Sequence, residues 1–376
     1  MMAFLDKCQV IGKFAEPQTH ATTDEKFFKT LRNRVAAVLK GNGRTWRGEV
    51  VFAVVEIVVI MSLYCLFLYM RNKTGDFVWA ILCGITVSRI GFMQHCGNHA
   101  SFSPNKWLNK ICGHTMDAIG GSSFIWLFDH GIAHHVSPNE LGHDNDCEIA
   151  NPLLRFHPKL PRKWWHKNQH LWTISLMTGG LLNWYVLDLK AFAAGAVGAI
   201  KLYPQNIDLL IVAVFKSLWF YLNIWTLFHN HGPARAVALL LVCYGIASHL
   251  IENIFIVNHI QPGLVHGPFE HWARKQVISS CNWASGSVFW NFMSGGLNHQ
   301  IEHHLFPSMN IYNYPLISPV VKNTCKEFGL SYISFPTFAD AHKSMRNYLW
   351  IMGEQDEVPE SMFLPNLFKA ETHKSH

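Results

Sequence analysis

The chain has 376 residues, of which 49% are hydrophobic and only 15% are charged, with a formal net charge of +6. An average soluble domain carries about 25% charged residues, so this composition favours a polytopic membrane protein. No basic stripe with interleaved aromatic residues occurs, which argues against a nucleic-acid partner. The 23 histidines are the second departure from the average, and they indicate transition-metal binding because histidine is the commonest protein ligand for such metals.

Residues 1–47 are polar and basic, with nine Lys or Arg, and we assign them to a cytosolic N-terminal segment. The first 18 residues lack a continuous apolar run, so we expect no cleaved signal peptide. Within this segment, residues 27–40 (FFKTLRNRVAAVLK) have the pattern of an amphipathic helix on the membrane surface. The nine cysteines are scattered without a CxxC pair, so we expect free thiols.

Four apolar stretches follow in the membrane domain, residues 48–352, and each has close to the roughly 20 residues that cross a bilayer. The predicted spans are 51–70, 77–94, 207–228 and 237–257. Each contains at least one ionisable residue, which indicates that the bundle interior is not wholly lipid-facing. These residues are Glu56, Arg89, Lys216 and Glu252. The positive-inside rule keeps the basic N-terminal segment cytosolic, so the blocks 95–206 and 258–376 share the cytosolic side.

Two further segments have membrane-related composition. Residues 162–172 mix Trp with Lys and Arg, as helices at the headgroup level do. Residues 181–200 predict a re-entrant or interfacial segment; the alternative is a fifth span, which would separate the histidine clusters across the membrane. Residues 353–376 are predicted to form a loose polar tail.

Three histidine clusters lie just beyond the cytosolic ends of predicted spans. They are His95 and His99 in QHCGNHAS; His130, His134 and His135 in DHGIAHHVSPN; and His303 and His304 in GGLNHQIEHHLFP. Residues four apart lie on one face of an α-helix, so the first and last histidine of each HxxxH can point at one metal. Adjacent histidines diverge by about 100°, so each HH pair can serve two ions.

The clusters together predict a two-metal site. An HxxxH alone is a weak pattern, but three clusters on one membrane face are far more easily explained by metal binding than by chance. The number of histidines in the three clusters exceeds the four ligands that a structural zinc takes. The chain has no HExxH of the zinc hydrolases, and a pair of irons that activates O2 is the chemistry that most needs such a site. Isolated histidines are interpreted as surface residues: His20, His114, His231, His342, His373 and His376.

The order HxxxH, HxxxHH, QxxHH resembles the membrane fatty acid desaturase family, and Gln300 in QIEHH is similar to its front-end subgroup. The likeness extends over residues 45–350. Family-like segments are DNDCEIANPLLRFHP, QHLW, VNHI and WARKQVISSCNW. The resemblance implies an all-α membrane enzyme with about four spans and a cytosolic, histidine-rich di-iron cap.

By this resemblance the chain introduces a cis double bond into a long-chain (poly)unsaturated acyl chain, using O2, at the endoplasmic reticulum membrane. The substrate would be a CoA- or lipid-linked fatty acyl group. The implied iron ligands are His95, His99, His130, His134, His135, His259, His303 and His304. Further ligands or supporting groups are expected among Gln300, Glu302, His299 and His170, with Glu302 either orienting an imidazole or solvated.

The chain departs from the family pattern in three places. No HPGG haem motif occurs, so we expect electrons from a separate cytochrome b5 and its reductase. Cys96 follows His95 where the family usually has a carboxylate, and His299 replaces an apolar residue beside Gln300. Alternatives on the same scaffold are a hydroxylase, an acetylenase or a sphingolipid desaturase; the non-enzyme alternative is a receptor or metal transporter.

Overall fold

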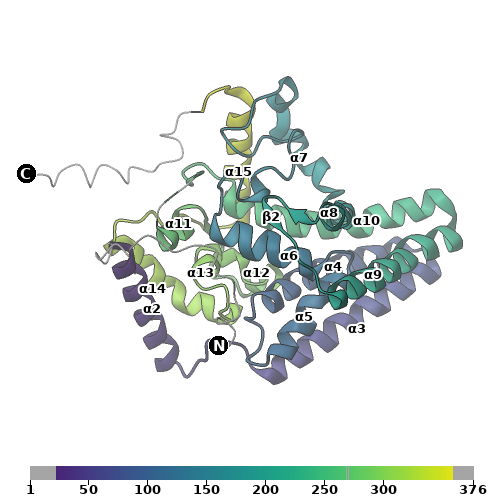
Figure 1. Cartoon of the computed structure of the whole chain (residues 1–376), viewed down its shortest axis with the longest axis horizontal. Helices are drawn as coiled ribbons and strands as arrows, with labels where there is room; N and C mark the ends of the chain where they lie inside the picture. The colour runs from purple at the N-terminus through teal and green to yellow at the C-terminus, as the bar shows by residue number, and fades with distance from the viewer. Residues whose placement is uncertain (1–22, 268, 270, 359–376) are drawn as a thin grey trace, which may run out of the picture.

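The structure is a computed structural model that describes residues 23–267, 269 and 271–358 (Figure 1). Long helices form a membrane bundle, and shorter helices form a cap over one end of it. The elements up to the middle of the chain are α2 Thr23–Gly41, α3 Val50–Thr74, α4 Phe77–Asn98, α5 Lys106–Ala118, α6 Ser123–Trp126, the π-helix η1 Leu127–His134, η2 Asn145–Cys147, η3 Trp164–Asn168, α7 Gln169–Met177, α8 Gly180–Ala194, β1 Ala196–Val197 and β2 Ile200–Lys201. The rest are α9 Asn206–Phe220, the π-helix η4 Tyr221–Trp225, α10 Thr226–His259, α11 Trp272–Ile278, β3 Asn282–Trp283, α12 Val288–Met293, η5 Leu297–His299, α13 Gln300–Leu305, η6 Ile311–Asn313, α14 Tyr314–Glu327, β4 Ser334–Phe335 and α15 Phe338–Glu354.

The bundle is built from helical hairpins. Among the described residues, three helices are long and apolar enough to cross a membrane: α3, α4, and one of 54 residues that joins α9, η4 and α10. The four predicted spans are all present, and the last two are the arms of this one helix. It is kinked at Gly232, whose φ of 71° only glycine adopts easily, and Pro233 follows. The kink lets α10 return beside α9 (Figure 1).

The turns of the two hairpins meet at the end of the bundle away from the cap. The α3–α4 turn is Gly75, whose carbonyl accepts a hydrogen bond from Arg235 Nε at 3.0 Å. His231 lies 2.9 Å from the Asn72 carbonyl oxygen, so this histidine is at the end of the bundle away from the cap. With the turns fastened together, the opposite ends of α4 and α10 also lie together, and these ends carry His95 and His259.

Helix α3 faces outward and α4 is internal. Only 11% of the apolar window of α3 is buried, against 67% for α4. The exposed α3 side chains are large and apolar, as in Val51 and Phe52, each 70% exposed. Such a surface is stable against lipid and not against water, which agrees with a polytopic membrane protein.

Two ion pairs lie within the bundle. Arg89 of α4 forms an ion pair with Glu56 of α3. Lys216 of α9 contacts Asp188 of α8 at 2.6 Å and donates to the Gly120 carbonyl. These contacts confirm that the interior is polar in places. They also show why 181–200 is not a fifth span: α8 has only 15 residues and lies against α9 through Asp188.

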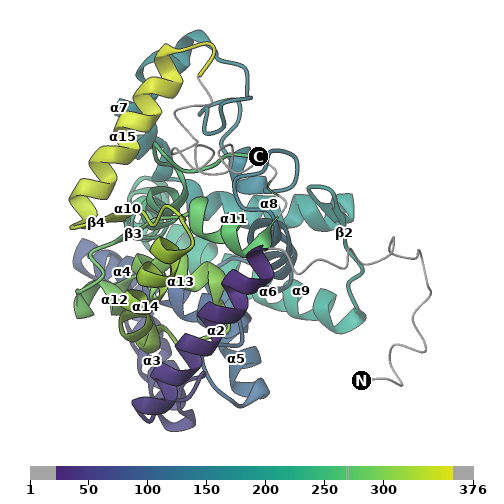
Figure 2. The same ribbon diagram turned by 90° about the vertical axis from the view of Figure 1, so that its left-hand side faces the viewer.

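The cap contains the N-terminal helix and the C-terminal helix. Helix α2 is amphipathic as predicted, but its apolar face is buried against protein, not lipid: Phe27 packs edge-on against Phe328 beyond α14. Figure 2 shows α2 across α14, and α15 beside α7. The predicted 162–172 helix is η3 with the start of α7. Residues 353–356 are not loose, because Arg155 donates to the carbonyls of Gln355 and Asp356.

Other features follow the expectations. The strands are two-residue pairs, β1–β2 antiparallel and β3–β4 parallel, so the all-α class is confirmed. The eight described cysteines are free. The predictions for residues 1–22 and 359–376, including His20, His373 and His376, lie outside the described residues.

The Glu56–Arg89 pair generates a stability prediction. Two Arg89 nitrogens already lack hydrogen-bond partners, so the removal of Glu56 leaves a buried cation uncompensated. Glu56→Leu should lower the free energy of unfolding by about 3 kcal/mol. The double variant Glu56→Leu with Arg89→Leu should recover most of it. Unfolding in detergent measures both; the control Glu49→Leu removes an exposed charge near the same helix and should change little. A double variant no more stable than the single one contradicts the argument.

Candidate metal centre

Eight histidines from four parts of the chain meet at the cap end of α4 and α10. They divide into two groups, in each of which the candidate ligand atoms lie within 4.8 Å of one another; a third set within the same distance combines His130 and His134 with the exposed Asp146. The larger group holds His95, His99, His130, His135 and His303. The smaller group holds His134, His259 and His304. The structure thus brings together all eight residues of the expected ligand set.

The spacing between ring nitrogens suits metal coordination. The Nε2–Nε2 distance is 3.1 Å for His95–His130 and 3.2 Å for His135–His130, His303–His135 and His304–His259. Two imidazole nitrogens bound to one ion at about 2.1 Å are separated by about 3.0–3.4 Å at octahedral or tetrahedral angles. Nitrogen lone pairs this close repel one another unless a cation lies between them, so the donor set fits a metal in each group.

The outer ring nitrogens fix which way the imidazoles face. Four of them have oxygen partners on the surrounding elements. These are Ser279 O at 3.0 Å for His259, Gln276 Oε1 at 2.8 Å for His304, Asp144 Oδ2 at 3.0 Å for His134 and Tyr314 OH at 3.4 Å for His303. Carbonyl and carboxylate oxygens only accept, so Nδ1 donates its hydrogen and Nε2 offers a lone pair to the centre.

The second histidine box departs from the predicted pairing because it lies on a π-helix. An α-helix would align His130 with His134, four residues on. In η1 the turn is wider, with hydrogen bonds to the fifth residue, so His135 comes level with His130. His130 and His135 therefore share the larger group, and His134 joins the smaller. The expected divergence of adjacent histidines holds in geometry: the rings of His134 and His135 are inclined at 88°.

The sequence allows Gln300 to be either a ligand or a supporting group, and a hydrogen-bond chain sets its direction. Trp283 Nε1 can only donate, and it donates to Asn258 Oδ1 at 2.7 Å. Asn258 Nδ2 therefore faces Gln300 and donates to its Oε1 at 2.9 Å. The remaining Gln300 amide nitrogen lies 2.9 Å from His259 Nε2. Gln300 thus presents a donor, not an oxygen ligand, to the smaller group.

The other residues named from the sequence lie outside the two groups. Glu302 is fully buried, so a solvated role is excluded; it accepts hydrogen bonds from Asn282 and Tyr332, each at 2.7 Å. His299 is also buried, with its Nδ1 3.8 Å from Glu302. His170 lies on α7 and lines a pocket away from the centre.

Sequence reasoning missed the residues that hold the histidines. Asp144 accepts from both His134 and the Asn139 backbone N–H, the latter at 2.8 Å. The Asn139 side-chain amide donates to three carbonyls, those of His259, Val265 and Ser279. Asn139 has a φ of 59°, which Asn tolerates better than most residues. The segment DNDCEIANP contains Asp144, but nothing in the residue spacing indicates that Asp144 bonds to His134.

Aromatic side chains cover the larger group. Trp126 lies 4.5 Å from the His130 ring, between centroids, and 5.1 Å from His99. Phe255 of α10 lies 6.1 Å from His95 and 6.0 Å from His130. These rings keep water from the imidazoles. Cys96 is buried and faces the Gly295 carbonyl, so it takes no part in the groups.

Burial keeps most of these imidazoles neutral. It lowers the pKa of His99 to about 3 and that of four others far below the usual value. Those four are His130, His135, His303 and His304. His134 is the exception: burial lowers its pKa, but the charge and hydrogen bond of Asp144 outweigh burial and raise the pKa to about 9. Neutral imidazoles need release no proton when a metal binds.

Comparison with known proteins gives consistent matches. A family model described as fatty acid desaturase matches residues 76–336. The acyl-lipid (7-3)-desaturase, chloroplastic, of Chlamydomonas reinhardtii is 30% identical over 382 residues, which cover 95% of this chain and 72% of that protein. The acyl-lipid (8-3)-desaturase of Physcomitrium patens is 28% identical, with 84% and 69% covered. The sn-1 linoleoyl-lipid 6-desaturase of Arthrospira platensis is 30% identical, with 73% and 78% covered.

The bond between Asp144 and His134 predicts a difference between neighbouring carboxylates. Asp144→Asn keeps the shape of the side chain but removes the charge that orients His134, and it should weaken metal retention about 10- to 100-fold. Asp146 lies 3.4 Å from the same ring, but its side chain is 48% exposed. Asp146→Asn should therefore change retention little. Metal content after graded chelator treatment measures both; equal losses would contradict the assignment.

The buried imidazoles also predict a pH dependence for the chelator-treated protein. In the unfolded chain a histidine takes up a proton near pH 6.5, whereas the five buried rings with lowered pKa remain neutral. The unfolded state thus binds more protons below pH 6.5, and stability falls with falling pH. His134 acts in the opposite sense, since its contribution is lost only as pH rises through about 9.

The unfolding temperature of the metal-free protein in detergent should therefore decrease steadily from pH 7 to pH 5. Five depressed groups outweigh the single raised one in this window. Metal-loaded protein should show the same trend with higher midpoints, because protons compete for the ligand nitrogens. A midpoint that is constant or rises toward pH 5 would mean that these rings are not buried as described.

Proposed function

The chain belongs to the fatty acid desaturase family, and from this membership and its two histidine groups we propose a di-iron, O2-dependent front-end desaturase. It would introduce a cis double bond between an existing double bond and the carboxyl end of a long-chain polyunsaturated acyl group. The single observation that carries the proposal is the division of eight buried imidazoles into two groups at the cap end of the bundle.

The residues present fit iron. Imidazole-rich donor sets suit iron, copper and zinc, and two groups suit a redox pair better than one zinc. When bound, the irons would supply the O2 chemistry by which a CH2–CH2 unit, O2, two electrons and two protons give CH=CH and two waters. The five-histidine group would hold one ion and the three-histidine group the other, with the Gln300 amide nitrogen 2.9 Å from His259 Nε2 in the second group.

The protein side chains do the positioning. Outer hydrogen bonds from Ser279, Gln276 and Asp144 fix the imidazole rings, so little reorganisation is needed during the reaction. Trp126 and Phe255 exclude water from the larger group. An apolar acyl chain is best bound where water is already excluded, and this placement would hold its reacting carbons near the centre.

The wider setting rests on composition and on the relatives. Relatives named acyl-lipid and linoleoyl-lipid desaturases favour an acyl group carried by a membrane lipid over one carried by CoA. Electrons would come from a separate cytochrome b5 and its reductase. The basic N-terminal segment supports a cytosol-facing centre in the endoplasmic reticulum membrane. One relative is named chloroplastic, so a plastid membrane is the competing location.

Other functions on this scaffold have specific tests. A hydroxylase or acetylenase would use the same oxidant, and a sphingolipid desaturase would act on a sphingoid chain. A metal transporter should carry its ionisable residues near the bilayer midplane. Here the eight histidines lie at helix ends, Glu56 and Arg89 of the spans pair with each other, and Lys216 pairs with Asp188 of α8, which favours an enzyme over a transporter or receptor.

Metal and product analysis together test the proposal. The purified protein should contain about two irons per chain, and His304→Ala and His303→Ala should each reduce iron content, because each removes a nitrogen from a different group. Yeast expressing the chain and fed polyunsaturated acids should gain acyl chains two mass units lighter. Hydroxylated products without new unsaturation would reject a desaturase, and zinc as the only metal would reject the redox centre.

A further inference from the structure

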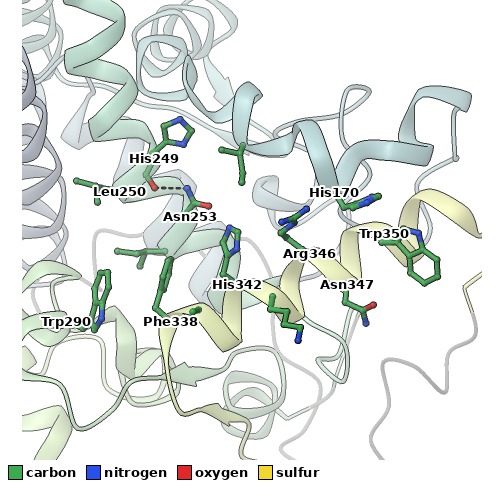
Figure 3. Close-up of a pocket in the computed structure, with 14 residues that line it drawn as sticks. His170, His249, Leu250, Asn253, Trp290, Phe338, His342, Arg346, Asn347 and Trp350 are labelled. Atoms are coloured by element: carbon green, nitrogen blue, oxygen red, sulfur yellow. Dashed lines mark hydrogen bonds between the residues drawn. The ribbon is translucent and has the colours of Figure 1, made fainter.

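A second site lies in the pocket between α7, α10 and α15, with a volume of about 610 Å³ (Figure 3). None of the metal-centre histidines lines it. Its walls are largely apolar and aromatic, with Trp290 and Phe338 on one side and Trp350 at the other end. A pocket of this size and composition is typical of a small-molecule or lipid site.

The polar side chains of this pocket are cationic or neutral. Lys343 and Arg346 of α15 line it, and neither has a carboxylate partner among the residues that the structure describes. Arg346 lies between His342 and His170 in Figure 3. Burial lowers the pKa of both imidazoles, and the positive charge of Arg346 lowers it further. Of the two imidazoles, only His170 is affected by a carboxylate: the charge of Glu354 raises its pKa.

Two buried polar atoms in the lining also lack partners. His170 Nδ1 and Asn253 Oδ1 make no hydrogen bond in the described part of the chain. The Asn253 amide nitrogen is occupied, since it donates to the His249 carbonyl at 2.8 Å. Buried polar atoms without partners are uncommon and call for a bound group. Together with Arg346 they offer hydrogen bonds to an oxygen-rich anion that carries hydroxyl groups.

The position along α10 places the pocket at the membrane boundary. Ile254 lines the pocket, and the next residue, Phe255, packs on the metal-centre rings. His259 lies five residues after Ile254, which is about 7.5 Å further along the helix axis. The pocket is therefore at the cap end of the span, where tryptophan side chains mark the headgroup region. Trp350, 47% exposed, and Trp290 lie there.

We propose that this pocket binds the phosphate-bearing head group of a membrane glycerophospholipid, with Arg346 and Lys343 on the phosphate and the aromatic walls against the upper acyl chain. A guanidinium suits phosphate because it donates in a planar fork. The site is separate from the metal centre. That the bound lipid is also the acyl donor rests on the proposed function, but lipid binding does not require it.

Native mass spectrometry of the iron-loaded protein in detergent tests the site with phosphatidylglycerol as the probe. Arg346→Gln with Lys343→Gln should weaken the lipid adduct by at least about tenfold, because charged hydrogen bonds are lost. Ala339→Trp adds volume in the pocket without a change of charge and should weaken it as well. The control Lys322→Gln with Lys326→Gln removes two exposed charges from α14 and should bind as the unaltered protein does. Iron content should be unchanged in all variants.

Competition identifies the ligand. A neutral galactolipid of the same chain length, and inorganic phosphate at the same concentration, should not displace phosphatidylglycerol. Equal binding by the pocket variants, or equal binding of the galactolipid, would overturn the proposal. Displacement by coenzyme A would assign the pocket to a thioester carrier and overturn the lipid assignment. Unchanged iron content with lost lipid binding keeps this result distinct from failure of the metal centre.

Discussion

The structure depends on eight imidazole rings that share a dry space and must be aimed inward, most of them kept neutral by burial. Each ring nitrogen removed from water loses hydrogen bonds, and the loss is tolerated only where the other nitrogen is held and the inner one finds a cation. Ser279, Gln276, Asp144 and Tyr314 provide the outer bonds. The ends of α4 and α10, together with η1 and α13, must therefore meet within a few ångströms, and the fastened hairpin tips at Gly75 help hold them there.

Polar contacts around the centre connect elements that are distant in sequence. Asn139 bonds the end of α10 to the end of α11, and the Trp283–Asn258–Gln300 chain joins β3, α10 and α13. Each contact is buried, so a lost partner leaves an unsatisfied group as well as a misplaced ring. The same network that stabilises the cap therefore sets the direction of the donor that Gln300 presents to the smaller group.

The sequence predicted the parts of this arrangement that follow from local spacing. The positions of the spans, seven of the eight histidines and the division of each HH pair could be read from periodicity and motif order, whereas His259 is implied only by the family resemblance. The pairing of His130 with His135 could not, because a π-helix has no spacing signal distinct from that of an α-helix. The break between the third and fourth predicted spans falls at Gly232 and Pro233, where the sequence predicts a loop and the structure has a sharp kink. Asn139 and the packing of α2 against α14 depend on contacts across more than 100 residues, which no local pattern encodes. The partner of Asp144 is only ten residues away, but nothing in the spacing indicates it.

Two metal ions at these convergent helix ends are the central claim, and their positions can be measured directly. Anomalous diffraction at the iron edge from crystals of the iron-loaded protein should give two peaks. One should lie about 2.1 Å from nitrogens of the five-histidine group, and the other at the same distance from His134, His259 and His304. A single peak, or peaks outside both groups, would contradict the account.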